Sequence, residues 1–308
     1  MSVFITLFTS LLPLYALISL GYFCSKKMNV DRDSLATLGI YIFMPPVVFG
    51  YVANMDFKPE YIILPIFYYA ASVIIGLGFL ALGKRIYGDK QANLMAMSAS
   101  MGNTGYFGIP LMMLFFNEDI IAIYIFMMLG GTVYESTTGF YIAARSSFTV
   151  KQSIIKLIKF PGIYAIAAGL LWNILGLEFP DLAHVYWGHF KGCYVVIGMM
   201  ILGAALAKVD HLVFGWRFTA LTFAGKFIVF PTLTLLFVWL DQTFLHWLSV
   251  QELYYAMIMM AITPPAANIA AFAAQMDMEP EKAATTILIG TIFALIYIPC
   301  VIMVMGLS

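Results

Sequence analysis

Ten stretches of roughly 20 predominantly apolar residues follow one another along this chain of 308 residues. A helix of that length spans the hydrocarbon core of a bilayer, where irregular backbone would lack hydrogen-bond partners. Of all residues, 62% are hydrophobic and only 10% are charged, whereas soluble domains average about 25% charged residues. The sequence therefore predicts an all-α polytopic membrane protein. The expected spans are residues 4–24, 35–54, 60–83, 92–116, 120–144, 160–177, 184–207, 218–240, 252–275 and 283–307.

Several function classes are disfavoured by the composition. Lys plus Arg and Asp plus Glu number 16 each, so the chain lacks the basic excess of a nucleic-acid binder. The three cysteines and four histidines form no CxxC or HExxH motif, and we expect neither a metal site nor a cofactor. No nucleophile–base pair lies within the spans, which argues against an enzyme. A membrane sensor remains an alternative, although no span connection is long enough to fold as a separate output domain.

The basic residues predict the orientation of the chain, because cytoplasmic loops retain Lys and Arg. The connections after the first, third, fifth, seventh and ninth spans hold 13 of the 16 Lys and Arg residues, whereas the connections on the opposite side hold only Lys58 and Lys191. We therefore expect a multi-pass protein of the cell (cytoplasmic) membrane with both termini outside. The basic stretch at 145–159 is either an ordinary cytoplasmic loop or a segment along the inner headgroups. Asp241 and Glu252 are expected at the outer rim, in solvent.

The two halves of the chain, 1–150 and 151–308, show weak internal similarity. Five spans per half would give two inverted repeats. Pro65 and Pro231 are 166 residues apart, and Asn103 and Asn268, in the fourth and ninth spans, are 165 residues apart. Interrupted spans at matching places in two halves indicate the binding site of a transporter.

Proline and glycine interrupt the fourth and ninth spans. The run GNTGYFGIP (Gly102–Pro110) predicts that Pro110 frees the carbonyl of Tyr106, and Pro264 and Pro265 would free those of Met260 and Ala261. We expect the two broken spans to cross, with Gly102, Gly105 and Gly108 against Ala267, Ala270 and Ala274. Each break directs a partly positive helix N-terminus toward the middle of the membrane, where it favours an anion.

Four polar residues fall in one layer by helical rise, about 12–17 Å from the cytoplasmic face. Asn103 and Asn268 are expected to supply amide donors to the anion. Glu135 and Lys226 are buried charges, which are costly in lipid and therefore point to function. Either they form a structural ion pair, or Lys226 neutralises the anion while Glu135 takes up a proton.

Three motifs make the chain resemble the auxin efflux carrier family, which includes plant PIN carriers and prokaryotic permeases assigned to malonate or malate. They are GNTGYFGIPL (Gly102–Leu111), TPPAAN (Thr263–Asn268) and KFIVFP (Lys226–Pro231). The resemblance covers the whole chain, and the short loop at 145–159 is similar to that of prokaryotic members. PIN carriers have Asn-Pro-Asn-like sequences at the crossing. At the corresponding places this chain has Gly-Asn-Thr-Gly in the fourth span and Pro-Pro-Ala-Ala-Asn in the ninth. This departure favours a small carboxylate over auxin as the substrate.

The resemblance implies ten helices in two inverted repeats, as in bile-acid symporters and sodium/proton antiporters. Spans 1, 2, 6 and 7 would form a scaffold suited to homodimerisation, and spans 3–5 and 8–10 a moving transport unit with spans 4 and 9 crossing at its centre. The expected function is secondary transport of a malate- or malonate-like carboxylate by alternating access. The alternative is an H⁺- or Na⁺-coupled carrier of another substrate, such as an auxin-like acid; freed carbonyls keep one sodium site open. The candidate substrate-binding residues are Asn103, Thr104, Gly105, Tyr106, Pro110, Pro264, Pro265 and Asn268, with Glu135 and Lys226 for charge coupling.

Overall fold

The computed structural model describes residues 3–143, 150–208, 211–248, 250–276 and 278–306, and every regular element within these ranges is a helix. Seven helical stretches in them are long and apolar enough to cross a membrane, and two shorter ones, Thr104–Phe115 and Pro161–Ile174, are also apolar. The expectation of an all-α polytopic membrane protein is confirmed. The seven long stretches are Val3–Met28, Arg32–Ala53, Pro59–Ile86, Glu118–Ile142, Asp181–Ala207, Trp216–Leu245 and Pro280–Val304.

The three remaining expected spans are short or interrupted. Residues 92–116 divide into two helical pieces around residues 101–103, and residues 252–275 divide around residues 262–267. Between the fifth and sixth expected spans, residues 145–149 of the basic stretch lie outside the described residues, and the rest begins with a helix. In chain order the elements are α1 (Val3–Met28), α2 (Arg32–Leu38), η1 (Gly39–Phe43), α3 (Met44–Ala53), η2 (Pro59–Ile62), α4 (Ile63–Ile86), α5 (Asp89–Ser100), η3 (Thr104–Gly108), α6 (Ile109–Phe115), α7 (Glu118–Tyr134), η4 (Glu135–Gly139), α8 (Phe140–Ala143), α9 (Val150–Ile158), α10 (Pro161–Ile174), α11 (Asp181–Ala207), α12 (Trp216–Phe223), η5 (Ala224–Val229), α13 (Phe230–Leu240), η6 (Asp241–Leu245), α14 (Gln251–Ala261), α15 (Asn268–Gln275) and α16 (Pro280–Val304).

Helix boundaries follow from capping and from charge. Asn117 precedes α7, and its side chain accepts a hydrogen bond from the backbone N–H of Ile120 at 3.1 Å. Asp31 caps α2 in the same way through Ser34 N at 2.9 Å. Such caps satisfy backbone donors that a first helical turn leaves unpaired. Lys84 lies in the last turn of α4, where the helix dipole favours a cation.

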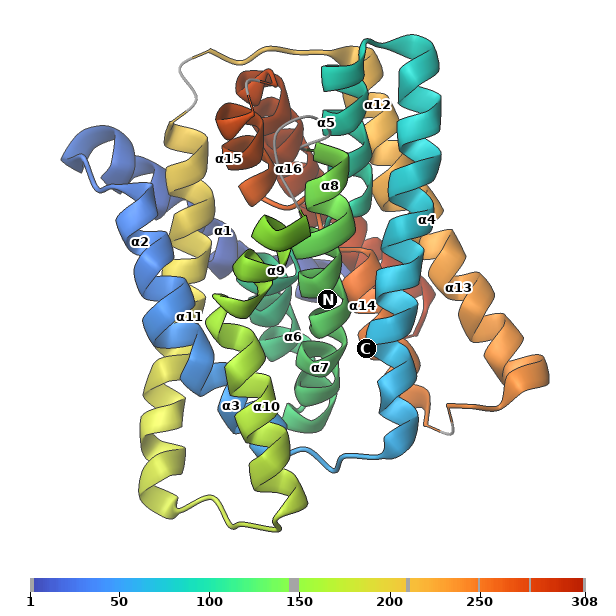
Figure 1. Ribbon diagram of the computed structural model, residues 1–308. Coiled ribbons are helices and arrows are strands. Elements are labelled where there is room, and N and C mark those ends of the chain that lie inside the picture. Colours follow the sequence, from blue (N-terminus) through green and yellow to red (C-terminus); the bar gives the residue numbers. More distant parts are fainter. Residues whose placement is uncertain (1–2, 144–149, 209–210, 249, 277, 307–308) are drawn as a thin grey trace.

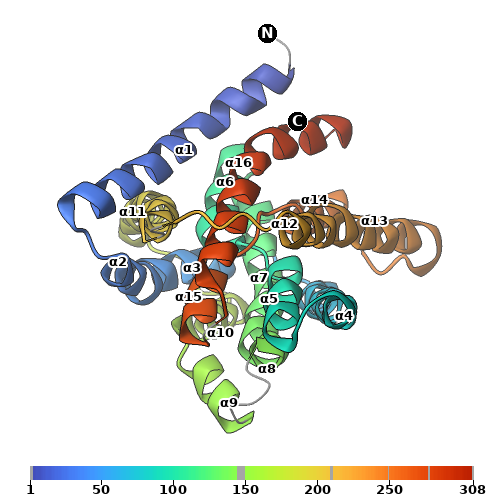
Figure 2. The ribbon, with the colours of Figure 1, turned by 90° about the horizontal axis from the view of Figure 1, so that it is seen from above.

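The helices form two groups around a central crossing. In one group α1 packs on α11 and α3 packs on α10; in the other α4 packs on both α5 and α7. Figure 1 shows α5 and α15 in the upper half of the molecule and α6 and α14 in the lower half, so that the two interrupted stretches cross near the centre. The view from above places α1 and α13 at the periphery (Figure 2). The crossing is therefore enclosed by helices.

The expectation that Asp241 is solvated is wrong. Its side chain is fully buried and accepts hydrogen bonds from the backbone N–H groups of Trp247 and Leu248, at 3.0 Å each, and from the Tyr254 hydroxyl at 2.9 Å. His246 adopts a left-handed conformation with φ of 49° and reverses the chain over the carboxylate. Asp241 thus organises the turn between α13 and α14.

Candidate functional site

The two interrupted stretches meet through their backbones. Asn103 N donates to Pro264 O at 2.8 Å, and Ala266 N donates to Met101 O at 3.0 Å, which pairs Gly102 with Pro265 in an isolated antiparallel bridge. Backbone groups inside a bilayer need internal partners, and here each break supplies partners for the other. The predicted crossing of the two stretches is therefore present, with the breaks at residues 101–103 and 262–267.

Details of the crossing differ from the expectation. Pro110 lies inside α6, after the π-helical segment η3, so the break precedes it by several residues. The carbonyl of Met260 is not left free either, because the Thr263 hydroxyl donates to it at 2.9 Å. The break in the fourth stretch lies where its backbone pairs with the break in the ninth stretch. The position of Pro110 alone does not determine where the helix is interrupted.

The glycines of the fourth stretch do not face Ala267, Ala270 and Ala274 as expected. A Cβ atom at Gly102 would lie 2.6 Å from Lys226 Nζ, one at Gly105 would lie 3.4 Å from the Tyr194 hydroxyl, and one at Gly108 would lie 2.9 Å from Cζ of Tyr124. A side chain at position 102 would meet Thr263 and Lys226, and one at position 108 would meet Tyr124. The sequence spacing did not reveal these close approaches.

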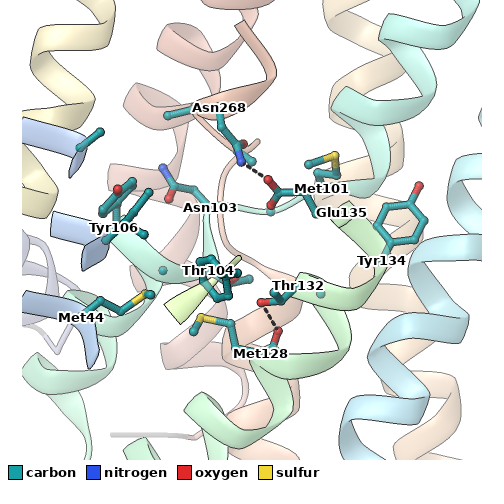
Figure 3. A pocket seen from close by; sticks show the side chains of 18 of the residues that line it. Met44, Met101, Asn103, Thr104, Tyr106, Met128, Thr132, Tyr134, Glu135 and Asn268 are labelled. Atoms are coloured by element: carbon teal, nitrogen blue, oxygen red, sulfur yellow. Dashed lines mark hydrogen bonds between the residues drawn. The ribbon is translucent and has the colours of Figure 1, made fainter. Parts of the chain in front are cut away.

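Asn103 and Asn268 lie at the two breaks but use their amides differently. Asn103 is buried, and its Oδ1 accepts from Phe107 N at 3.3 Å, which caps η3. This leaves the Asn103 NH₂ group for a ligand. Asn268 instead donates through Nδ2 to Glu135 Oε1 at 2.5 Å, and its buried Oδ1 has no hydrogen-bond partner in the described part of the chain. Figure 3 shows Asn103 between Tyr106 and the Asn268–Glu135 pair.

Lys226 lies apart from Glu135. Its side chain is fully buried, Nζ has no hydrogen-bond partner among the described residues, and it stands 4.4 Å from the ring centroid of Phe230. An ion pair between Lys226 and Glu135 is absent from the described part of the chain. Nζ lies near Gly102 and Thr263. Gly102 comes two residues after the end of α5, and Thr263 comes two residues after the end of α14. The ammonium therefore lies where two helix C-termini favour a cation.

A cavity of about 620 Å³ adjoins the crossing. Among the candidate residues, it is lined by Asn103, Thr104, Gly105, Tyr106, Asn268 and Glu135; it is not lined by Pro110, Pro264, Pro265 or Lys226. The two helix N-termini of the crossing, at Thr104 and Asn268, both border it. The cavity therefore offers an anion two partly positive helix ends and the amide of Asn103.

Other lining residues were not identified from the sequence. Aromatic and methionine side chains form much of the wall: Tyr68, Tyr134, Tyr194, Met44, Met101, Met128, Phe160 and Phe272. Two basic residues, Arg32 and Lys159, also line the cavity. Part of this wall has a sequence signal, because Met128 and Thr132 precede Glu135 by seven and three residues and so share its helix face. Arg32 has none, because it reads as one more basic residue of a cytoplasmic loop.

Comparison with known proteins assigns the chain to a class. The sequence profile of a family described as "membrane transport protein" matches residues 145–302. An uncharacterized transporter of Methanocaldococcus jannaschii is 28% identical over 230 residues, which cover 70% of this chain and 73% of the relative. An uncharacterized transporter of Methanothermobacter thermautotrophicus is 21% identical over 297 residues, which cover 94% of this chain and 95% of the relative.

Proposed function

Because the chain belongs to the auxin efflux carrier family of membrane transport proteins, we propose that it is a secondary transporter of a small organic anion. A malate- or malonate-like carboxylate binds beside the crossing, and alternating access carries it across the membrane. The observation that carries this proposal is the convergence of two helix N-termini and the free Asn103 amide on one cavity. Amides and helix ends attract a carboxylate without burying a compensating cation.

The proposed architecture has ten spans in two inverted repeats, 1–150 and 151–308. Spans 1, 2, 6 and 7 form a scaffold through which two copies pair, and the other six form the transport unit. Two observations support it: the breaks fall at equivalent places in the halves, and the cavity is lined from both helix groups, by Met44 of α3 and Tyr194 of α11 on one side and by α7 and α15 on the other. The distribution of basic residues supports termini outside the cell membrane.

Proton coupling through Glu135 is the favoured form of energy input. Glu135 borders the cavity and accepts from Asn268, so a change in its charge alters a group beside the anion. A sodium ion would need several oxygen ligands. The carbonyls of Met101, Pro264 and Met260, which the breaks would otherwise free, each accept a hydrogen bond instead. This favours H⁺ over Na⁺ as the coupling ion.

The cavity wall supports a second candidate substrate. A volume of about 620 Å³ lined by tyrosine, methionine and phenylalanine side chains is typical of sites for larger amphipathic ligands. An aromatic monocarboxylate of the auxin type would place its ring against this wall and its carboxylate at Asn103. This candidate substrate would bind its carboxylate at the same place as malate or malonate. It differs from them because its aromatic ring would fill the rest of the cavity.

Uptake into proteoliposomes tests the proposal. Radiolabelled malate, malonate and an indole carboxylate are offered separately under a pH gradient and under a sodium gradient. The matched variants are Asn103→Ala, which loses both cap and donor, and Asn103→Asp, which retains a capping oxygen but places a negative charge at the site. We expect carboxylate uptake driven by the pH gradient and at least about tenfold lower kcat/KM in Asn103→Asp at near-normal melting temperature. Absence of carboxylate flux in well-folded wild-type protein, or normal flux in Asn103→Asp, contradicts it.

A further inference from the structure

Arg32 lies on the face of its helix that borders the cavity. It begins α2, and Arg32, Ala36, Ile40 and Met44, spaced four residues apart along the continuous stretch of α2, η1 and α3, all line the cavity. Residues four apart stack on one helix face. The cavity therefore extends along α2 to its first turn, where Arg32, with only 15% of its side-chain surface exposed, is part of the wall.

The guanidinium has unused donors. Nη1 lies 3.0 Å from Asp33 Oδ1, whereas Nε is buried without an acceptor among the described residues. Nε and Nη2 form one edge of the planar group, which can hold a carboxylate through two parallel hydrogen bonds. A buried donor left unpaired costs free energy, and an anion in the cavity would remove that cost.

The neighbouring charges leave Arg32 incompletely neutralised. Asp33, its partner, is shared, because Lys208 Nζ lies 3.1 Å from Asp33 Oδ2. Lys159 adds a second cation to the cavity wall, and Glu135 is the acidic residue that lines it in the described part of the chain. The cavity wall thus includes two cationic residues, Arg32 and Lys159, in addition to the helix N-termini of the crossing.

We propose that Arg32 is a second anion-binding residue of the cavity, and that it selects substrates with two carboxylates over substrates with one. This inference rests on the proposed function and extends it by naming the residue that distinguishes a dicarboxylate from a monocarboxylate. The Nε–Nη2 edge binds one carboxylate at the α2 end of the cavity. A monocarboxylate of equal length leaves that edge unpaired and gains nothing from it.

Malate and 2-hydroxybutyrate make a matched pair of substrates, because one carboxylate of malate is replaced by a methyl group. Their uptake into proteoliposomes is compared in the wild type, Arg32→Gln, Arg32→Lys and Lys84→Gln. Lys84→Gln is the control, since it removes a positive charge that pairs with Asp89, away from Asp33, and that does not line the cavity. Melting temperature and size-exclusion profile verify that each variant folds.

We expect Arg32→Gln to raise the KM for malate about tenfold or more, as for loss of a hydrogen-bonded charge, and that for 2-hydroxybutyrate less than about twofold. Arg32→Lys should fall in between for malate, because it keeps the charge and loses the two-bond edge. Equal effects on both substrates, an equal effect of Lys84→Gln, or a wild-type malate KM in Arg32→Lys would overturn the inference while the transport function stands. If wild-type protein carries neither substrate, the proposed function fails and this inference with it.

Discussion

Asn268 and Glu135 illustrate how one hydrogen bond can link a charge to a ligand site. The Asn268 amide nitrogen is engaged by the Glu135 carboxylate, so while that bond persists it is not offered to an anion. Protonation of Glu135 would let the carboxyl group donate to Asn268 Oδ1, which has no partner among the described residues. The amide would then turn its NH₂ group toward the cavity. At the scale of single residues, this exchange of donor and acceptor is how the proposed transporter would couple a proton to an anion.

Glu135→Gln should therefore uncouple transport from the pH gradient. The glutamine is neutral at all pH values, so we expect uptake that no longer changes when an inward proton gradient is imposed, together with retained exchange of labelled for unlabelled anion. Initial rates in proteoliposomes measure this. Glu118→Gln is the control, because Glu118 begins α7, which continues into η4 with Glu135, but pairs with Lys191 away from the cavity. A pH response that survives in Glu135→Gln would exclude Glu135 as the proton site.

At the crossing of the two interrupted stretches, close packing restricts which side chains fit, in addition to the backbone hydrogen bonds. Gly102 sits in the break with Lys226 Nζ 2.6 Å from where a Cβ atom would be, whereas no atom lies within 4 Å of that position at Gly78 in α4. The backbone bridge between Gly102 and Pro265 holds both breaks in register. A change at position 102 therefore disturbs the bridge and the lysine together.

Gly102→Ala should destabilise the protein, whereas Gly78→Ala should not. Overpacking of this kind costs about 1–3 kcal/mol, while alanine in an exposed helix interior gains up to about 1 kcal/mol over glycine. Melting temperatures in one detergent, measured by intrinsic fluorescence, distinguish the two variants. An equal melting temperature for Gly102→Ala and wild type would mean that Lys226 moves aside without cost.

At the scale of the whole molecule, the cavity is lined by helices of both groups, including α3 and α11 on one side and α7 on the other. Close backbone packing joins α1 to α11, since a Cβ atom at Gly21 would clash with the backbone of Met200. The crossing, in turn, is tied together by main-chain bonds. Under the proposed alternating access, the cavity is where the change of access would take place, while these close contacts are kept.

Cysteine labelling tests that cavity and its orientation. In a background where Cys24, Cys193 and Cys300 are replaced by serine, Ala36→Cys lines the cavity and Leu20→Cys lies on the exposed apolar surface of α1. We expect a membrane-impermeant thiol reagent to label Ala36→Cys in inside-out vesicles, more slowly with malate present, and to leave Leu20→Cys unlabelled. Labelling of Ala36→Cys only from the outside would reverse the proposed orientation.

Much of the fold was predictable because bilayer length and apolar content determine it, as in the seven long helices. The breaks near Asn103 and Asn268 were also predictable, since glycine and proline mark them. The partners of these residues were not, because Glu135 is 133 positions from Asn268 and no periodicity links them. Asp241 was misplaced for a similar reason: its burial depends on a chain reversal at His246. Arg32 was hidden by its place in a basic loop.

The bridge between the two breaks has a consequence for how such a protein diversifies. Its bonds run from Asn103 N to Pro264 O and from Ala266 N to Met101 O, and main-chain groups are the same in almost every residue type. Those two contacts use no side-chain atom, so they depend on neighbouring side chains only where space is limiting, as at Gly102. Side chains that face the cavity are thus free to vary while the crossing is inherited intact. A change of substrate would therefore require only a few substitutions in the cavity, with the same backbone arrangement.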